Sequence, residues 1–208
     1  KKIIKEVQPN IVINCIGILN KAAADVKALT ALINSCLPHY LSELSINENF
    51  KLIHISTDCV FNGEEGEYIE NSHKNATDFY GQSKALGEVI NNRSVTLRTS
   101  IVGPDINPNG IGLFEWFMDQ KGSVGGYDKV IWTGVTTIWC AKCMEIAIEN
   151  KLAGLHHCVN NEMISKYDLL QLFKKYFDKD IEINHNVDAV SKKTLVRTDV
   201  SFDFGIPS

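Results

Sequence analysis

Short apolar runs alternate with helical patterns over the first half of the chain, and this alternation constrains the fold more than any other feature. The apolar runs are rich in Ile and Val and occupy residues 10–16, 51–57 and 95–99. The helical patterns occupy residues 1–8, 22–44 and 77–91. Strands that alternate with helices form parallel βαβ units with right-handed crossovers. The sequence therefore predicts an α/β fold built on a doubly wound parallel sheet.

Two of these segments carry more specific expectations. Residues 10–16 are almost continuously apolar, which is typical of a strand buried on both faces. Pro38 lies inside the helical pattern of residues 22–44. Because proline has no N–H to donate to the preceding turn, we expect Pro38 to kink this helix or to divide it in two.

The alternation loosens after residue 103, which predicts a smaller C-terminal lobe. Residues 103–112 are rich in Gly, Pro and Asn and are expected to form a loop. Further helices are predicted at residues 113–120 and 137–150, and strands at residues 155–159 and 181–183. Ser165 and Asp168 have the spacing of a capping box, so another helix should begin there. Its predicted apolar face consists of Leu169, Leu172, Phe173 and Phe177.

The net charge, the apolar runs and the cysteines limit which partners and which cellular compartment are expected. The formal net charge of −4 leaves no basic footprint, so neither nucleic acid nor an anionic membrane is an expected partner. No apolar run approaches the roughly 18 residues that span a bilayer, and no signal peptide is recognisable, so we expect a cytoplasmic protein. The six cysteines lie mostly in apolar segments, which is typical of free thiols in a reducing compartment.

Polar motifs follow the predicted strands at their carboxyl ends, where open parallel sheets bind ligands. Thr57 ends the second strand within the string Ser56-Thr57-Asp58. Tyr80 and Lys84 lie four residues apart in the next helix and therefore share one face. The string Arg98-Thr99-Ser100-Ile101 ends the third strand.

These residue types suit the reduction of a ketone, which needs a hydride on carbon and a proton on the developing alkoxide. A tyrosine phenol has a pKa of about 10, and a nearby cation makes its ionised form easier to reach. Lys84 is expected to supply that charge to Tyr80. Thr57 can donate a hydrogen bond to the carbonyl oxygen and hold it in position.

Two longer strings carry a resemblance to a known family. Residues 56–63 read STDCVFNG, and residues 80–88 read YGQSKALGE, with Tyr68 and Glu70 between them. The chain resembles the extended short-chain dehydrogenase/reductases, and within them the dTDP-4-dehydrorhamnose reductase branch. The resemblance implies that Thr57, Tyr80 and Lys84 form the catalytic set. It also implies a Rossmann-like nucleotide-binding part over residues 1–103, and mainly a substrate-binding lobe, intertwined with the first part, over residues 104–208.

The resemblance further implies a cofactor and a substrate. The cofactor is NADPH or NADH, and the residues implied to bind it are Cys15, Ile16, Gly17, Ser56, Tyr80, Lys84, Ser100 and Ile101. The residues implied to face the substrate are Val60, Phe61 and Asn62. The implied reaction is reduction of a nucleotide-linked 4-keto-6-deoxy sugar, in the synthesis of cell-surface polysaccharide precursors. The oligomeric state stays open, with a homodimer as one option.

One departure from the family pattern leaves other functions open. The glycine fingerprint that cradles the cofactor pyrophosphate is absent, and residues 10–16 match the fourth strand of the family. Family proportions then imply about 50 to 60 further residues upstream. Without the glycine fingerprint, the chain as printed is expected to bind a nicotinamide dinucleotide very weakly or not at all. One alternative is a non-catalytic relative such as a regulatory subunit of methionine adenosyltransferase. Another is a sister sugar-nucleotide epimerase or dehydratase.

Several further polar or sulfur side chains could be functional, but most are expected to have structural roles. Cys140 and Cys143 have the spacing of a redox motif, but they lie one turn into a predicted helix with core spacing, so packing is expected. Neither these thiols nor His156, His157 and Cys158 have a recognisable zinc-ligand spacing, so no metal site is predicted. His54 alternates within a strand and is expected in the core. Asn34 is either a buried polar group or a bridge to the active site.

Overall fold

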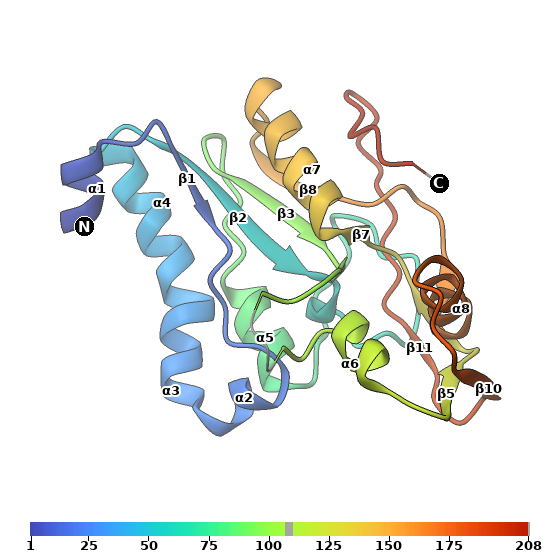
Figure 1. Ribbon diagram of the computed structural model, residues 1–208. Helices are drawn as coiled ribbons and strands as arrows, with labels where there is room; N and C mark the ends of the chain where they lie inside the picture. Colours follow the sequence, from blue (N-terminus) through green and yellow to red (C-terminus); the bar gives the residue numbers. More distant parts are fainter. Residues whose placement is uncertain (107–109, 208) are drawn as a thin grey trace.

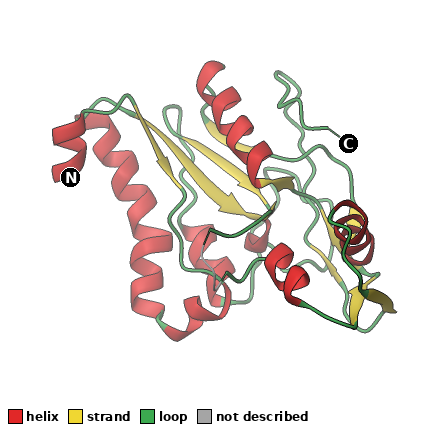
Figure 2. Ribbon diagram, viewed as in Figure 1, coloured by secondary structure: helices red, strands yellow, loops and turns green. Residues whose placement is uncertain are grey.

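The computed structural model describes residues 1–106 and 110–207, and its main feature is a parallel sheet with helices on both faces (Figures 1 and 2). Within these residues the sheet has the strand order β1-β2-β3-β8. The strands are β1 (Ile11–Asn14), β2 (Lys51–Thr57), β3 (Val95–Thr99) and β8 (Gly154–His157). Every neighbouring pair is parallel. The predicted doubly wound α/β fold is therefore confirmed.

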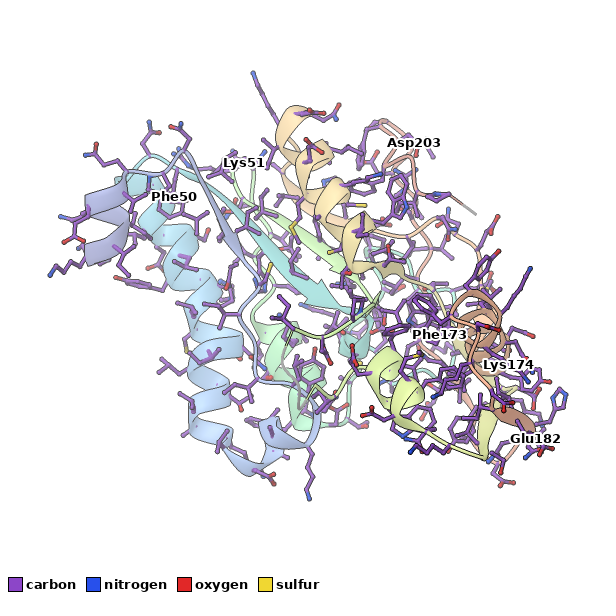
Figure 3. All side chains as sticks on the ribbon, viewed as in Figure 1. Phe50, Lys51, Phe173, Lys174, Glu182 and Asp203 are labelled. Atoms are coloured by element: carbon purple, nitrogen blue, oxygen red, sulfur yellow. The ribbon has the colours of Figure 1, made fainter. Side chains whose placement is uncertain are left out.

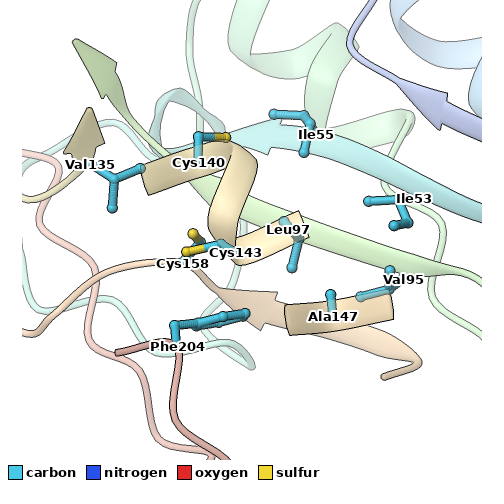
Figure 4. Packing of buried hydrophobic residues seen from close by; sticks show 10 residues of the cluster. All are labelled: Ile53, Ile55, Val95, Leu97, Val135, Cys140, Cys143, Ala147, Cys158 and Phe204. Atoms are coloured by element: carbon cyan, nitrogen blue, oxygen red, sulfur yellow. The ribbon is translucent and has the colours of Figure 1, made fainter. Parts of the chain in front are cut away.

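One face of the sheet packs against α7 (Thr137–Glu149). Alternate residues of β2 and β3 point to this face, because successive side chains of a strand point to opposite sides. Figure 4 shows the resulting core, which consists of Ile53, Ile55, Val95, Leu97, Val135, Cys140, Cys143, Ala147, Cys158 and Phe204. The thiols of Cys140 and Cys143 pack here as small apolar groups, as expected for their spacing.

The other face is covered by a long helical segment and by α5 (Phe79–Leu86). After α2 (Asn20–Asp25), the segment comprises α3 (Lys27–Thr30), a π-helical stretch η1 (Ala31–Cys36) and α4 (Leu37–Asn47). The predicted division of the helix at Pro38 is wrong, since the backbone at Thr30, Cys36 and Leu37 is helical and the chain breaks at Val26 instead. Pro38 is tolerated because it occupies the first turn of α4, directly after the wider π turns.

The first strand is less buried than its apolar sequence predicts. β1 covers only four of the expected residues, and the side chain of Ile13 is 45% exposed. Within the described residues β1 is the edge strand, paired only with β2, and Val12 packs against the cluster of Leu44, Phe50 and Leu52. The expectation of burial on both faces is therefore wrong for Ile13. The preceding α1 (Lys2–Val7) buries no residue.

A smaller lobe is built from the second half of the chain. Its elements are β4 (Ile101–Val102), α6 (Leu113–Asp119), β5 (Ser123–Tyr127), β6 (Val130–Trp132), β7 (Val135–Thr136), β9 (Ile164–Ser165), α8 (Lys166–Tyr176), β10 (Glu182–Asn186) and β11 (Ser191–Lys192). Phe173 of α8, which Figure 3 labels, packs edge-on against Phe114 of α6, and their ring centroids are 5.3 Å apart. Because α7 and β8 return to the main sheet, the two halves interleave, and a division at residue 103 stays a prediction.

The start of α8 is as predicted, and so is part of its apolar face, since Leu169 and Phe173 are buried. The Ser165 hydroxyl accepts a hydrogen bond from the Asp168 N–H at 3.0 Å and caps the helix. Leu172 and Phe177 of the predicted face are 40% and 52% exposed, and Leu170 is buried in their place. Part of the predicted loop at residues 103–112, namely residues 107–109, lies outside the described residues. No helix of the described chain is long and apolar enough to cross a bilayer.

Candidate active site

Thr57 and Tyr80 meet at the carboxyl end of β2. Thr57 is the last residue of β2, and its Oγ1 accepts a hydrogen bond from the Cys59 N–H at 3.2 Å. Tyr80 lies in the first turn of α5, which Asp78 caps by accepting from the Gly81 N–H at 2.9 Å. The Thr57 hydroxyl lies beside the Tyr80 phenol and acts to lower its pKa. The structure thus brings together two of the three predicted catalytic residues.

Gly81 makes this meeting possible, because the α5 backbone packs directly on the carbonyl of Cys59. A Cβ at Gly81 would collide with the Cys59 carbonyl oxygen and with the Cβ of Ala76. We expect Gly81→Ala to lower the free energy of unfolding by about 1–3 kcal/mol, since backbone must shift. Urea unfolding measures this change. Gly125→Ala is the control, because a Cβ there meets only Asn186 atoms at 3.5 Å or more; equal losses in both variants would contradict the close approach.

The third residue, Lys84, lies one turn further along α5 and is buried. Its Nζ donates to the carbonyl oxygen of Ile55 at 2.7 Å. Burial lowers the pKa of this ammonium to about 8, while the charge of Glu88 and the thiol of Cys15 act in the opposite direction. The expected lowering of the Tyr80 pKa by Lys84 is not seen. Burial raises the pKa of the phenol, and the neighbouring Cys59 adds to the rise.

The segment expected to pass the cofactor, residues 15–17, lies at the carboxyl end of β1. Cys15 is exposed, and Ile16 is 59% exposed. Asn34 of the π-helical stretch fixes the backbone just beyond: its Oδ1 accepts from the Ile18 N–H at 2.8 Å, and its Nδ2 donates to the Ile18 carbonyl at 2.9 Å. The same amide donates to the Ser83 hydroxyl of α5 at 3.0 Å. Asn34 is therefore both buried and a bridge between this segment and the helix of Tyr80 and Lys84.

The other residues implied to bind the cofactor are placed in different ways. The Ser56 hydroxyl points away from Thr57 and donates to Glu88 Oε1 at 2.7 Å, within the protein interior. The Ser100 hydroxyl accepts from the Trp132 indole N–H at 2.8 Å. Ile101 is 44% exposed. Ser56 could thus meet a cofactor only through its backbone, whereas Ile101 presents its side chain to the surface.

Two of the three residues expected on the substrate side are core residues. Val60 and Phe61 are fully buried, and the Phe61 ring stacks on Tyr68 with centroids 4.0 Å apart. Asn62 accepts a hydrogen bond from the Tyr68 phenol at 3.0 Å. The structure therefore leaves Asn62 and the backbone of this turn as the groups able to face a substrate.

A pocket of about 390 Å³ in the smaller lobe was not predicted from the sequence. It lies between α6, β5, β6 and α8, and its lining residues are Leu113, Trp116, Gly125, Tyr127, Val130, Lys166 and Leu170. The Lys166 ammonium is 5.2 Å from the Trp132 ring centroid, and its charge acts on Asp58. Burial lowers the Lys166 pKa, against the opposing effect of Asp58. Lys166 thus lines the pocket and also acts on Asp58, which follows Thr57. Lys166 is more than a hundred residues from Thr57 in the sequence, and no sequence motif marks it.

A buried ionic network behind the site was also missed. Glu88 accepts two hydrogen bonds from the Arg98 guanidinium, Nε to Oε1 at 2.9 Å and Nη2 to Oε2 at 2.8 Å. Arg98 Nη1 lies 2.8 Å from His157 Nε2, and His157 Nδ1 lies 2.9 Å from the Val196 carbonyl oxygen. Because Ser56 also donates to Glu88, the network ties β2, β3, β8 and the end of α5 together. The Glu in the GQSKALGE string and the Arg before Thr99 are the sequence signal.

The thiols of Cys140 and Cys143 on α7 are expected to be structural. Burial raises the pKa of Cys140 to about 12, so it stays a thiol at neutral pH. The sulfur atoms of Cys143 and Cys158 approach one another in the core (Figure 4). We expect no zinc and no disulfide at Cys140 and Cys143 after anaerobic purification, because metal ligation requires thiolates. Elemental analysis and thiol titration after unfolding test this; stoichiometric zinc would contradict a packing role.

His54 lies in the core, as expected from its strand position. It is fully buried, and its Nδ1 lies 3.1 Å from the Asn14 amide nitrogen. Burial lowers its pKa to about 3, so the ring is neutral at physiological pH.

Comparison with known proteins adds a family and a fold. A family model described as RmlD substrate binding domain matches residues 1–198. A dTDP-4-dehydrorhamnose reductase of Aggregatibacter actinomycetemcomitans is 35% identical over 104 residues, which cover 47% of this chain and 35% of the relative. Methionine adenosyltransferase 2 subunit beta of Xenopus laevis is 24% identical over 183 residues, which cover 81% of this chain and 55% of the relative. The matches thus span about half or less of these relatives' lengths.

Solved structures of similar proteins share the fold. The dTDP-4-dehydrorhamnose reductase of Clostridium acetobutylicum superposes with a TM-score of 0.81 at 22% identity, covering 94% of this chain and 74% of that chain. The enzyme of the same name from Bacillus anthracis, in complex with NADP, also has a TM-score of 0.81, at 20% identity, covering 93% of this chain and 74% of that chain. These likenesses support the α/β fold described above.

Proposed function

Because this chain belongs to the RmlD substrate binding domain family, we propose that it carries the catalytic set of a reductase acting on nucleotide-linked sugars. The substrate is a nucleotide-linked 4-keto-6-deoxy sugar, and the reductant is NADPH or NADH. The observation that carries the proposal is that Thr57, at the carboxyl end of β2, lies beside the Tyr80 phenol of α5, with Lys84 one turn along the same helix. The role of such a product in cell-surface polysaccharide synthesis, a cytoplasmic location and a homodimer stay predictions of the sequence.

The residues around Lys84 fit the nicotinamide half of such a cofactor. An ammonium group has three N–H donors, and among the described residues one of them is used, by the carbonyl of Ile55. The remaining donors can bind ribose hydroxyls at the carboxyl end of the sheet, beside the exposed Cys15 and Ile16. When bound, the dinucleotide supplies the hydride.

Thr57 positions the keto oxygen of the substrate, and Tyr80 supplies the proton. Thr57 donates a hydrogen bond from Oγ1 to the keto oxygen and holds it beside Tyr80. As negative charge develops on that oxygen, Tyr80 transfers the proton of its Oη to it, which gives the alcohol. The tyrosinate left behind regains a proton from solvent.

The pocket in the smaller lobe suits the nucleotide end of the substrate. Trp116 and Tyr127 offer aromatic surface for a base, and Lys166 brings a positive charge for the phosphates. Lys166 also lies near Asp58, next to Thr57. A substrate that filled the pocket would therefore extend past Lys166 toward the catalytic set.

The test is a steady-state assay of the native polypeptide that contains this chain. Oxidation of NADPH or NADH is followed at 340 nm, as usual for these cofactors, with a dTDP-4-keto-6-deoxy sugar as acceptor. We expect turnover with this acceptor and none with the free sugar, because the nucleotide supplies binding energy. Absence of turnover, together with a change in methionine adenosyltransferase activity on mixing, would replace the reductase by a regulatory function, to which the similarity with methionine adenosyltransferase 2 subunit beta points.

A further inference from the structure

Asp58 is a buried carboxyl group next to the Thr57 hydroxyl. Only 7% of Asp58 is exposed. The Thr57 Oγ1 donates to Asp58 Oδ1 at 3.0 Å. The titratable groups that face Asp58 come from four elements: Lys166 at the start of α8, Lys193 after β11, Cys59 in the turn after β2, and Tyr80 in α5. No step of the mechanism above uses this carboxyl group.

The hydrogen-bonding capacity of Thr57 depends on the protonation state of Asp58. A hydroxyl has one donor hydrogen and two acceptor lone pairs. With an ionised Asp58, the Thr57 hydrogen is given to the carboxylate, and Oγ1 accepts from the Cys59 N–H. The one donor hydrogen is then in use, so Thr57 has none left for a keto oxygen.

We infer that Asp58 is protonated in the working site and reverses this hydrogen bond, donating to Thr57 Oγ1 so that the threonine hydrogen is free for the keto oxygen. Oγ1 then accepts from Asp58 and from the Cys59 N–H, which fills both lone pairs. The Tyr80 phenol can give its own hydrogen to the same keto oxygen. Asp58 is thus a positioning residue, and this role rests on the proposed reductase function.

The environment of Asp58 favours the protonated form. Burial raises the pKa of its carboxyl group, and this effect outweighs the hydrogen bond from Thr57 and the charges of Lys193 and Lys166. Because the pKa is raised, the proton is held at low pH and is lost as the pH rises through the raised value. The role of Thr57 as a donor should be lost in the same direction. Lys84, with a pKa of about 8, adds a separate loss on the alkaline side.

Two substitutions separate orientation from simple packing. The amide of Asp58→Asn has N–H groups that can donate to Thr57 Oγ1 at any pH, whereas Asp58→Ala offers no donor. We expect kcat of Asp58→Asn to exceed that of Asp58→Ala by at least about tenfold, with the KM for NADPH of both within a few-fold of wild type. The alkaline loss of kcat should shift to higher pH in Asp58→Asn, leaving the loss due to Lys84. Equal kcat values in the two variants, or an unshifted pH profile, would overturn the inference.

Infrared difference spectroscopy tests the protonation state without any assay of activity. The spectrum of wild type minus Asp58→Asn, in the folded native polypeptide, should contain the C=O stretch of a carboxylic acid at neutral pH and lose it on alkaline titration. A carboxylate band alone at neutral pH would refute the inference even if the protein is an active reductase. A carboxylic acid band in a protein without reductase activity would instead refute the proposed function and leave the protonation of Asp58 standing. Thermal unfolding by circular dichroism verifies that each variant is folded.

Discussion

Tyr80→Phe is expected to abolish turnover in the native polypeptide while leaving the affinity for NADPH within a few-fold of wild type. The phenol acts on charge that develops in the transition state, so its loss should appear in kcat rather than in ground-state binding. Proton transfer by a positioned side chain contributes about 10²- to 10⁴-fold to the rate, and a loss of that size is expected. Steady-state kinetics beside a calorimetric titration with NADPH measure the two quantities.

Tyr176→Phe is the matched control for this substitution. Tyr176 lies at the end of α8, and 71% of it is exposed, so loss of its hydroxyl should change neither rate nor affinity. If Tyr80→Phe kept most of the wild-type kcat, Tyr80 would not be the proton donor.

Arg98→Met should have the largest effect on stability. Arg98 is 1% exposed and forms a two-point ion pair with the buried Glu88. Removing the guanidinium leaves the Glu88 carboxylate in the interior with weaker compensation, from Ser56 and from Lys74 at 3.2 Å. Breaking one side of such a pair costs about 3–5 kcal/mol, and we expect a loss in this range. Urea unfolding of the variant and of wild type gives the difference.

A double substitution shows whether the loss comes from the unpaired charge. Arg98→Met combined with Glu88→Leu removes both charges, and its loss should be smaller than that of Arg98→Met alone. The control is Arg93→Met, since Arg93 is exposed and bonds the Ser45 carbonyl at 3.1 Å near the surface. We expect a loss below about 1 kcal/mol there. A double variant at least as unstable as Arg98→Met would show that packing, not charge, dominates at this position.

Local patterns in the sequence predicted most elements of the main sheet. The predicted strands at residues 51–57 and 95–99 coincide with β2 and β3, and the helix starting at Ser165 is capped as its spacing indicates. These segments carry their information locally, in apolar runs and capping residues. Pro38 was misread because a local rule for helix breaking does not include the π-helical turns that accommodate it.

The candidate site was predictable in part for a similar reason. Thr57 follows a buried strand, and the spacing of Tyr80 and Lys84 places them on one helix face, so their position at the carboxyl end of the sheet could be predicted. The direction of a side chain within the turn could not. Val60 and Phe61 were expected beside a substrate, yet they pack into the core, where Phe61 stacks on Tyr68 and faces the Arg98 guanidinium.

The sequence by itself determined the fold class and predicted the catalytic set, because both depend on residues close together in the chain. Only the tertiary structure decided the surroundings of that set, which come from distant segments. Lys166 and Lys193 reach Asp58 from the smaller lobe, and His157 and Val196 complete the network around Arg98 and Glu88. The protonation state of a buried group depends on how deeply the folded chain buries it and which charges it brings near. The depth of burial and the nearby charges are both set only when the chain folds.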